Sequence, residues 1–438
     1  MNAILISAYV VPVVVIFVVY LYRLRQRENA AIRAAEDALA ASMTEPPTLH
    51  PVIDPTLCIG CRSCVAACPE QHAHPVLGMI RGKAWLVGPS NCIGHGACKA
   101  ACPEGAISLV FGTERRGVDI PFVKPDFETN VAGIFIAGEL GGMGLIRNAI
   151  EQGRQAIESI GGRIKNKVGD SLDIAIIGAG PAGIAASLGA KEAGLRYITL
   201  EQDSLGGTVA HFPRGKLVMT QPAQLPIVGK MQFRETTKEK LLEYWQKVVS
   251  KVGLDIKYNE RVTGIKPQTG TPGFVIETAT NQYAAQNVLL AIGRRGTPRQ
   301  LGVPGEERSK VVYRLIDPEQ YEGQHVLVVG GGDSALEAAH SIAEVPGTSV
   351  TLSYRSPAFT RAKPANRAKV EALAAAGRLR VATGSQVREI AADTVLLATE
   401  GGDVQIRNDA VIVCAGGILP TGFLREIGVE VETKHGVA

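Results

Sequence analysis

The stretch "LDIAIIGAGPAGIAASLGAKEAGLRYITLEQ", residues 172–202, predicts the fold of most of the chain. It begins as a buried strand, turns on Gly178, Gly180 and Gly183, continues as a helix and ends a second strand at Glu201. Strand, glycine turn, helix and terminal acid together are typical of a Rossmann-like dinucleotide-binding unit. The glycines admit a pyrophosphate to the helix N-terminus, where backbone amides favour anions. Glu201 is predicted to accept hydrogen bonds from the adenosine ribose.

A second unit of the same kind follows at "HVLVVGGGDSALEAAHSIAEVPGTSVTLSYR", residues 325–355. Gly330, Gly332 and Ala335 take the fingerprint positions. No acid ends its second strand, and Arg355 stands there instead. An arginine suits the 2′-phosphate of NADP, whereas NAD favours an acid. We therefore predict NADPH, with its 2′-phosphate on Arg355 and Arg361; a solvated arginine is the alternative.

From about residue 107 onward the chain resembles the thioredoxin-reductase-like flavoproteins. "LLAIGRRGTPRQLGVPGE" (289–306) is similar to that family's crossover from the flavin domain to the nicotinamide domain, and "VIVCAGGILPTGFL" (411–424) to its return. The resemblance implies FAD on the first glycine turn, with Gly206, Gly207 and Thr208 forming a loop on the flavin side.

Two departures from the family pattern change the expected chemistry. Disulfide reductases of this family carry a redox-active C-x-x-C, and no such pair follows residue 107, where Cys414 is the one cysteine. The segment "FETNVAGIFIAGELGGMGLIRNAIEQGRQAIESI" (127–160) resembles the family's C-terminal flavin motif but precedes the first glycine turn. The flavin domain therefore resembles a circular permutant, which places Gly138 and Glu139 at the flavin, with Glu139 in the position of the family's aspartate.

Seven of the eight cysteines lie between Cys58 and Cys102. The run "CIGCRSCVAACPE" has the C-x2-C-x2-C-x3-C-P spacing of bacterial iron–sulfur proteins, and "CIGHGACKAACPE" repeats it with His95 in the second position. The segment resembles a two-cluster ferredoxin. That resemblance implies one 4Fe-4S cluster on Cys58, Cys61, Cys64 and Cys102, and a second on Cys68, Cys92 and Cys98.

Three roles are open for His95. It ligates the fourth iron of the second cluster and raises its potential, or the site holds a three-iron cluster on three thiolates, or the histidine is a bystander in a glycine-flanked turn. His72 and His74 are expected to be solvent-facing loop residues.

The N-terminal segment is uncharged from Ala3 to Tyr22 and is followed by Arg23, Arg25 and Arg27. About 20 residues of helix span roughly 30 Å, the thickness of a hydrocarbon core. This pattern predicts a single-pass membrane anchor with the remaining chain in the cytoplasm; a buried core helix is the alternative.

The expected fold class is α/β, with two Rossmann-like domains, a small α+β two-cluster ferredoxin-like domain and one N-terminal transmembrane helix. The predicted boundaries are 1–25 for the anchor, 26–50 for a helical stalk and Pro-rich linker, 51–110 for the ferredoxin-like domain, 111–297 for the FAD domain and 298–438 for the nicotinamide domain. The net charge of +4 and the sparse aromatic residues argue against nucleic-acid binding.

These patterns predict a membrane-anchored iron–sulfur flavoprotein that moves electrons between NADPH, FAD, two clusters and a redox protein or membrane acceptor. No side chain is expected to act as an essential acid, base or nucleophile in hydride transfer. Two other functions stay open: a reductase of an external low-molecular-weight disulfide, whose site "HFPRGKLVMTQP" (211–222) would line, and a non-enzymatic electron-transfer or sensing subunit. A homodimer is also open.

Overall fold

A computed structural model describes residues 2–40, 46, 49–72, 75–92, 94, 96–113, 117–142, 144–164, 171–220, 222–233, 235–359 and 362–436. The chain divides into two compact units, one of residues 1–118 and 434–438 and one of residues 119–433. The finer predicted division into an anchor, a linker, a ferredoxin-like domain and two nucleotide domains stays a prediction.

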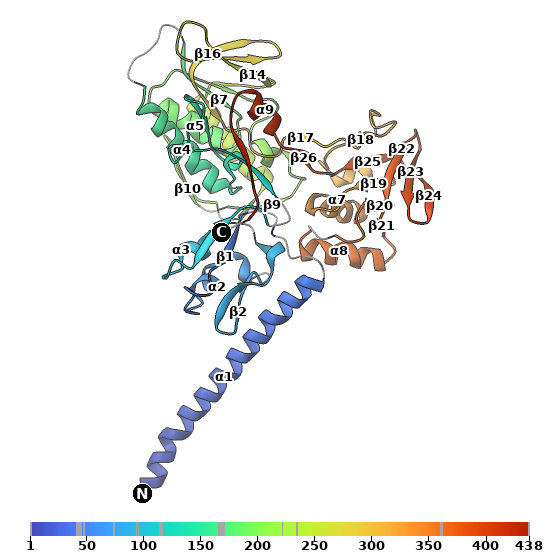
Figure 1. Cartoon of the computed structure of the whole chain (residues 1–438). Coiled ribbons are helices and arrows are strands. Elements are labelled where there is room, and N and C mark those ends of the chain that lie inside the picture. The colour runs from blue at the N-terminus through green and yellow to red at the C-terminus, as the bar shows by residue number, and fades with distance from the viewer. Residues whose placement is uncertain are drawn as a thin grey trace. The chain divides into compact units, whose positions relative to one another are not determined.

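The first unit begins with one long helix, α1 (Asn2–Ala40), which contains Pro12 without ending there (Figure 1). The predicted anchor and the predicted stalk are thus parts of a single helix. Among the residues that the structure describes, no helix is both long enough and apolar enough to cross a membrane. The transmembrane helix predicted over residues 1–25 therefore has no support from the described residues.

A small α+β body follows α1. Two pairs of antiparallel strands and two short helices, each in a cysteine run, make up this body: β1 (His50–Ile53) with β4 (Ile107–Val110), β2 (Leu77–Ile80) with β3 (Lys83–Leu86), and α2 (Ser63–Ala67) and α3 (Ala97–Ala100). The 3-10 turns η1 (Pro69–His72) and η2 (Pro89–Asn91) come before and after the β2–β3 hairpin. Four of the eight buried residues of its core are cysteines, as expected of a fold organised around an iron–sulfur centre.

The second unit contains a seven-stranded sheet that carries the first glycine turn. Its order is β13 (Ile256–Lys257), β8 (Tyr197–Leu200), β7 (Leu172–Ile177), β16 (Gln282–Leu290), β15 (Phe274–Thr278) and β14 (Val262–Pro267), with β6 (Ile134–Ile136) also paired to β16. Strands β13, β8, β7, β16 and β6 run parallel, as a dinucleotide-binding sheet requires.

The segment resembling a displaced C-terminal flavin motif joins this same sheet. Strand β6 pairs in parallel with β16, and α4 (Ile146–Gly161) packs on α5 (Pro181–Glu192), the helix of the glycine turn (Figure 1). A Cβ on Gly153 of α4 would lie 2.1 Å from the Ala182 carbonyl oxygen, so the two helices approach closely at this point.

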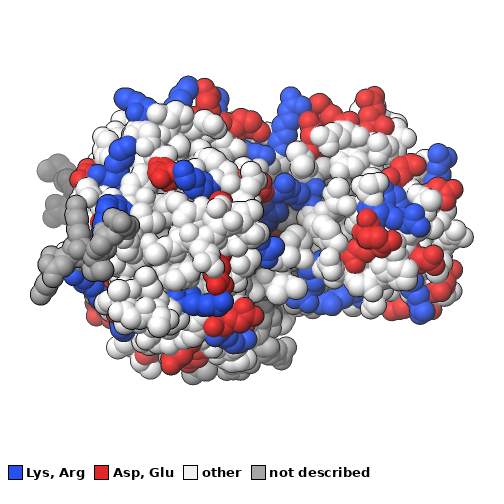
Figure 2. Space-filling view, turned by 90° about the horizontal axis from the view of Figure 1, so that it is seen from above, with Lys and Arg blue, Asp and Glu red and all other residues white. Residues whose placement is uncertain are grey.

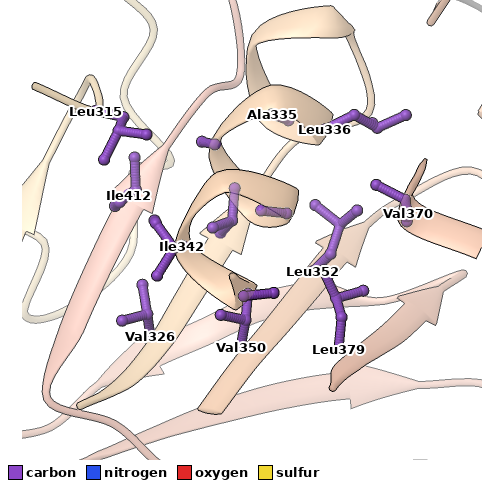
Figure 3. Close-up of a cluster of buried hydrophobic side chains, with 14 of the residues drawn as sticks. Leu315, Val326, Ala335, Leu336, Ile342, Val350, Leu352, Val370, Leu379 and Ile412 are labelled. Atoms are coloured by element: carbon purple, nitrogen blue, oxygen red, sulfur yellow. The ribbon is translucent and has the colours of Figure 1, made fainter. Parts of the chain in front are cut away.

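A five-stranded parallel sheet carries the second glycine turn. Its order is β18 (Val311–Val312), β25 (Ala410–Val413), β19 (His325–Val329), β20 (Ser349–Tyr354) and β21 (Leu379–Thr383), covered by α7 (Asp333–Ala343) and α8 (Pro364–Ala375). Figure 3 shows Ile342 of α7 beside Val326 of β19, and the buried side chains of this helix and of the strands, Val350 and Leu352 among them, are nearly inaccessible to solvent. Burying each large aliphatic side chain of this kind stabilises the fold by about 1.5–3 kcal/mol.

The remaining elements connect or extend these sheets. They are β5 (Val118–Pro121) with β27 (Val431–Lys434), η3 (Glu139–Gly141), η4 (Gly207–His211), β9 (Leu217–Met219) with β12 (Glu235–Thr237), β10 (Ala223–Leu225) with β11 (Gly229–Met231), α6 (Lys238–Val252), β17 (Thr297–Pro298) with β26 (Gly417–Ile418), η5 (Pro318–Tyr321), the meander β22 (Gln386–Ile390), β23 (Thr394–Thr399) and β24 (Gly402–Arg407), and α9 (Thr421–Glu426). Pairing of β17 with β26 brings the predicted crossover and return segments side by side.

Acidic and basic side chains are interspersed on the face drawn in Figure 2, in keeping with the net charge of +4.

Candidate functional site

The first glycine turn leaves open space at one of its three fingerprint positions. Gly178 has φ +106°, and a Cβ there would lie 2.6 Å from the Ala291 carbonyl oxygen. A Cβ on Gly183 would lie 1.8 Å from the Gly178 carbonyl oxygen, so α5 packs directly on the turn. At Gly180 the nearest atom to a Cβ is the Gly207 Cα, at 3.8 Å. A tight turn, close helix packing and one open position are what a dinucleotide pyrophosphate requires, so these residues fit FAD.

Glu201 lies at the end of β8, where the sequence places a ribose-binding acid. Its side chain is buried, and its two carboxylate oxygens accept the backbone N–H groups of Ala179 and Asp203 at 2.7 and 2.9 Å. Burial raises the pKa of Glu201, and the two backbone donors oppose that effect. These donors hold the carboxylate at the turn, where its remaining lone pairs are free to accept ribose hydroxyl groups.

The loop of Gly206, Gly207 and Thr208 closes over the same turn. Gly206 donates its backbone N–H to the Ala179 carbonyl oxygen at 2.9 Å. A Cβ on Gly207 would lie 3.1 Å from the Gly180 Cα. The structure therefore brings this predicted loop to the open position of the turn.

Gly138 and Glu139 reach the same site from β6. A Cβ on Gly138 would lie 3.0 Å from that of Ala182, in the first turn of α5, and Gly138 donates its N–H to the Gln152 side chain at 2.8 Å. Burial raises the pKa of Glu139, and the charge of nearby Arg294 acts in the opposite direction. Gly138, like Gly206, Gly207 and Glu201, thus lies beside the first glycine turn or the helix that follows it.

The second glycine turn repeats this geometry between β19 and α7. Gly330 has φ +144°, and a Cβ there would lie 2.4 Å from the Cys414 carbonyl oxygen. Nothing lies within 4 Å of a Cβ on Gly332, while Ala335 is fully buried against the sheet. In each turn the first glycine packs against a backbone carbonyl at the end of the strand that is adjacent in the sheet. That carbonyl belongs to Ala291 in the first turn and to Cys414 in the second, so the second turn also fits a dinucleotide.

The end of β20 carries the residues predicted to choose between NADPH and NADH. Arg355 is exposed there, and Arg361 lies outside the described residues. The preceding Ser353 is buried and its hydroxyl is 2.7 Å from that of Ser385. Tyr354 stacks on Phe359 with ring centroids 5.5 Å apart.

Four cysteine side chains from the two runs line one pocket in the first unit. The pocket encloses about 330 Å³, part of it open to solvent. The sulfur ligands predicted for the first cluster all line it: Cys58, Cys61, Cys64 and Cys102. Burial raises the pKa of Cys64 to about 11, whereas a hydrogen bond from Ser63 lowers the pKa of exposed Cys61.

The cysteines predicted for the second cluster are all buried: Cys68, Cys92 and Cys98. Burial raises the pKa of Cys92 to about 11, and Cys98 and Cys68 are close enough to Cys92 to raise it further. His95 and His74 lie outside the described residues, as does the side chain of His72. Among the described residues, no group of three or more His, Cys, Asp and Glu converges to hold a single metal ion.

Sequence reasoning did not anticipate a basic cluster near the flavin-side loop. His211, at the end of η4, contacts the Arg314 guanidinium through Nδ1 and lies 3.4 Å from Asp203 through Nε2. Burial lowers the pKa of His211 to about 4, with further lowering from Arg295 and Arg314. The pair Arg294–Arg295 in the crossover segment is the sequence signal that marks this cluster.

The comparisons with known proteins agree with this geometry. The profile described as "Pyridine nucleotide-disulphide oxidoreductase" matches residues 175–437, well over half of the chain. The chain belongs to this family. A second profile, "4Fe-4S dicluster domain", matches residues 50–103. The protein is therefore an NAD(P)H-dependent flavin oxidoreductase joined to an iron–sulfur domain, which confirms the family and enzyme class predicted from the sequence.

Individual relatives each match about 60% of the chain. This family member is 29% identical over 268 residues to bacilliredoxin reductase Bdr from Bacillus subtilis, covering 60% of this chain and 82% of the relative. It is 28% identical over 271 residues to a ferredoxin–NADP reductase from Ignicoccus hospitalis, covering 60% and 83%. The solved structure of bacillithiol disulfide reductase Bdr from Staphylococcus aureus has a TM-score of 0.53 at 24% identity, covering 60% and 81%, and supports the fold.

Proposed function

We propose that this family member moves electrons between NADPH and a partner acceptor by way of FAD and two iron–sulfur clusters. Bound FAD takes two electrons from a nicotinamide and can release them singly, which suits one-electron centres. The direction of flow is set by potentials, and delivery to a redox protein is the direction we propose.

The distribution of cysteines carries this proposal. The flavin and nicotinamide domains contain Cys414 alone, and burial raises the pKa of its thiol to about 12. An internal dithiol is therefore unavailable to receive electrons, because disulfide exchange needs two thiols and a thiolate nucleophile. The other seven cysteines all lie in the segment that matches a 4Fe-4S dicluster domain.

The residues of the two turns act by binding and orientation. Gly180 and Gly332 leave space for the pyrophosphates, and the N-termini of α5 and α7 direct backbone N–H groups at them. Glu201 holds the ribose of the flavin nucleotide. We propose that Arg355 and Arg361 bind the 2′-phosphate and so select NADPH over NADH.

An anaerobic NADPH titration, followed by optical and EPR spectroscopy, tests the electron route. Flavin absorbance is expected to fall while reduced iron–sulfur signals rise within the same titration. A protein without iron, or iron that stays oxidised after the flavin is bleached, would refute the proposal. Flavin that NADPH does not reduce would instead favour a non-enzymatic subunit.

The role of His95 is tested in the same titration. If His95 ligates the second cluster, His95→Cys and His95→Ala are each expected to shift the signal of one cluster and leave the other unchanged. Unchanged signals in both variants would make the histidine a bystander. The EPR signal of a three-iron cluster in the parent protein would show that three thiolates hold the second cluster without His95.

A reductase of an external low-molecular-weight disulfide is the second candidate, because two of the similar proteins bear the names bacilliredoxin reductase and bacillithiol disulfide reductase. The segment 211–222 predicted to line such a site has its charges paired within the unit, since Arg214 bonds Asp317 at 3.0 Å and Lys216 bonds Glu337 at 2.6 Å. This favours a structural role for the segment. Disulfide reduction that survives complete loss of iron would establish the second candidate.

We also propose that α1 associates with the membrane, as a single-pass anchor with the other domains on the cytoplasmic side. The support is a run of large apolar and tyrosine side chains from Val10 to Tyr22. Every Val, Ile, Phe, Leu and Tyr residue of this run is 40–67% exposed. Such a continuous apolar surface is unfavourable in water and marks a site of burial. Arginines Arg23, Arg25 and Arg27 follow it, as the positive-inside rule expects.

Membrane fractionation of full-length variants tests this anchor. Val15→Asp places a charge within the apolar run, which costs about 3 kcal/mol at the centre of a membrane helix, and is expected to move protein from the carbonate-resistant pellet to the supernatant. Leu39→Asp is the matched control, because Leu39 is a 69% exposed apolar residue of the same helix outside the run. Parent protein found wholly in the supernatant would refute the anchor.

A further inference from the structure

The last third of α1 is packed against the β2–β3 hairpin of the first unit. Ala31 and Ala38 are both 6% exposed. A Cβ on Gly78 of β2 would lie 2.5 Å from the Cβ of Ala31, so a glycine is needed for this approach. Glu28 accepts the backbone N–H of Arg81, at the hairpin tip, at 2.6 Å. The helix and the hairpin are therefore held together at two levels.

These two contacts define which way the hairpin points along the helix. Glu28 precedes Ala31, so the tip at Arg81–Gly82 lies closer to the apolar run of α1 than Gly78 does. Glu28 comes six positions after Tyr22, which is about 9 Å of helix. The polar region of one bilayer leaflet is roughly 5–7 Å thick. If the run inserts as proposed, the tip comes to the outer edge of the lipid headgroups.

The loop of the first cysteine run lies against that same tip. A Cβ on Gly60 would lie 2.3 Å from the Gly82 carbonyl oxygen, and Lys83 donates to the Cys58 carbonyl oxygen at 2.6 Å. The loop exposes Leu57 by 51% and Ile59 by 64%. Two large apolar side chains therefore stand in solvent beside the hairpin tip.

The side chains around this surface have the chemistry of a lipid interface. Arg81 is exposed at the tip and adds to the arginines that follow Tyr22, which favours anionic headgroups.

We propose that the loop Leu57–Arg62 and the tip Arg81–Gly82 form a lipid-contacting surface that holds the first cysteine pocket against anionic membrane headgroups. Ile59, Cys61 and Arg62 of this loop line that pocket, and Cys61 is its exposed cysteine. This inference rests on the membrane association proposed above. Continuity with the apolar run of α1 favours lipid over a protein partner or a second copy of the chain.

Tryptophan fluorescence tests this contact in the full-length holoprotein. The chain has two tryptophans, Trp85 and the fully buried Trp245. In a Trp85→Phe/Trp245→Phe background, Ile59→Trp places the only reporter on the loop, and Ser108→Trp places a control on an exposed position of β4. Phosphatidylcholine–phosphatidylglycerol vesicles carry a quencher on the lipid headgroup, and cosedimentation is measured on the same samples.

We expect both reporter proteins to sediment with vesicles, with quenching several-fold stronger for Ile59→Trp than for Ser108→Trp. Equal quenching of the two reporters in sedimented protein would overturn the surface while leaving the anchor intact. Protein that stays in the supernatant would overturn the anchor and the surface together. The proposal would also be overturned if, without vesicles, the tryptophan at residue 59 were shielded from solvent and the protein had twice the mass of one chain. That result would assign the surface to self-association.

A charge variant gives an independent readout. Arg81→Gln removes the cation but keeps the backbone N–H that Glu28 accepts. We expect it to reduce the quenching of the residue-59 reporter on anionic vesicles and to leave it unchanged on purely zwitterionic ones. An effect of equal size on both lipids, or none on either, would contradict a role for headgroup charge.

Discussion

At the residue scale, the first glycine turn separates a glycine needed by the fold from one needed by the ligand. Gly183→Ala would force a Cβ to 1.8 Å from the Gly178 carbonyl oxygen, whereas Gly180→Ala meets nothing closer than 3.8 Å. We expect Gly183→Ala to lower the free energy of unfolding by about 1–3 kcal/mol, as overpacking does. Gly180→Ala is expected to keep the apoprotein's stability and to weaken FAD binding, because its methyl group enters the space of the pyrophosphate.

Urea unfolding of the apoproteins and FAD titration measure the two effects separately. Equal loss of stability in both variants would mean that the space at Gly180 is not a ligand space. The equivalent open position at Gly332 allows the same comparison for NADPH, since nothing lies within 4 Å of a Cβ there.

His211 predicts a pH dependence of stability. Burial and the charges of Arg295, Arg314 and Lys238 lower its pKa to about 4 from an ordinary value of 6.5, and Asp203 opposes this only in part. The unfolded chain therefore binds a proton at a higher pH than the folded protein does. Stability from this residue is fully present above pH 6.5 and is lost as the pH falls toward 4, by roughly 3 kcal/mol in total.

His211→Gln is expected to remove this part of the acid destabilisation, because glutamine does not titrate. The measurement is the free energy of unfolding of parent and variant at matched pH values from 7 down to 4. Parallel curves for the two proteins would show that the histidine is protonated as readily in the folded state as in the unfolded chain.

At the scale of elements, the contact of α1 with the hairpin makes a matched pair of variants available. Ala31 is buried against Gly78, whereas its neighbour Ala30 is exposed. Ala31→Leu is expected to lower the free energy of unfolding of the iron–sulfur domain by about 1–3 kcal/mol and so to lower its melting temperature. Ala30→Leu is expected to leave both nearly unchanged. Visible absorbance of the clusters during heating reports the difference. An equal shift in both variants would mean that the helix is not packed on the hairpin in solution.

The same contact shows where sequence reasoning reaches its limit. The glycine turns and cysteine runs were predictable because a pyrophosphate and an iron–sulfur cluster each demand fixed residue types at fixed spacing. Ala31 and Gly78 are far apart in sequence, and alanine at helical spacing is equally at home on an exposed face. Ala31 and Ala38, two turns apart on one face of the helix, are buried, whereas Ala30 and Ala40 of the same stretch are exposed, so the alanines alone did not mark the buried face.

The basic cluster was hidden for a related reason. His211, Arg295 and Arg314 belong to three segments, and pairing of β17 with β26 positions the crossover that carries Arg295. No spacing rule connects such residues before the sheets form. The displaced segment 127–160, by contrast, was predicted to lie at the flavin because it resembles the family's C-terminal flavin motif, and its β6 pairs with β16 of the flavin sheet while α4 packs on α5.

At the scale of the whole molecule, the separation of cysteines from nucleotide sites predicts that flavin reduction and iron reduction can be uncoupled. Cys64 and Cys98 are buried and belong to the two different predicted ligand sets. Cys64→Ala and Cys98→Ala are each expected to remove one of two EPR signals and about four of roughly eight iron atoms per chain. Cys414→Ser, the control in the nicotinamide domain, is expected to keep both signals.

NADPH is expected to bleach the flavin at the parent rate in all three variants, because neither glycine turn involves these side chains. Stopped-flow absorbance and iron analysis measure both quantities. Loss of flavin reduction together with iron would instead make the clusters a structural requirement of the nucleotide domains, and would contradict a downstream role.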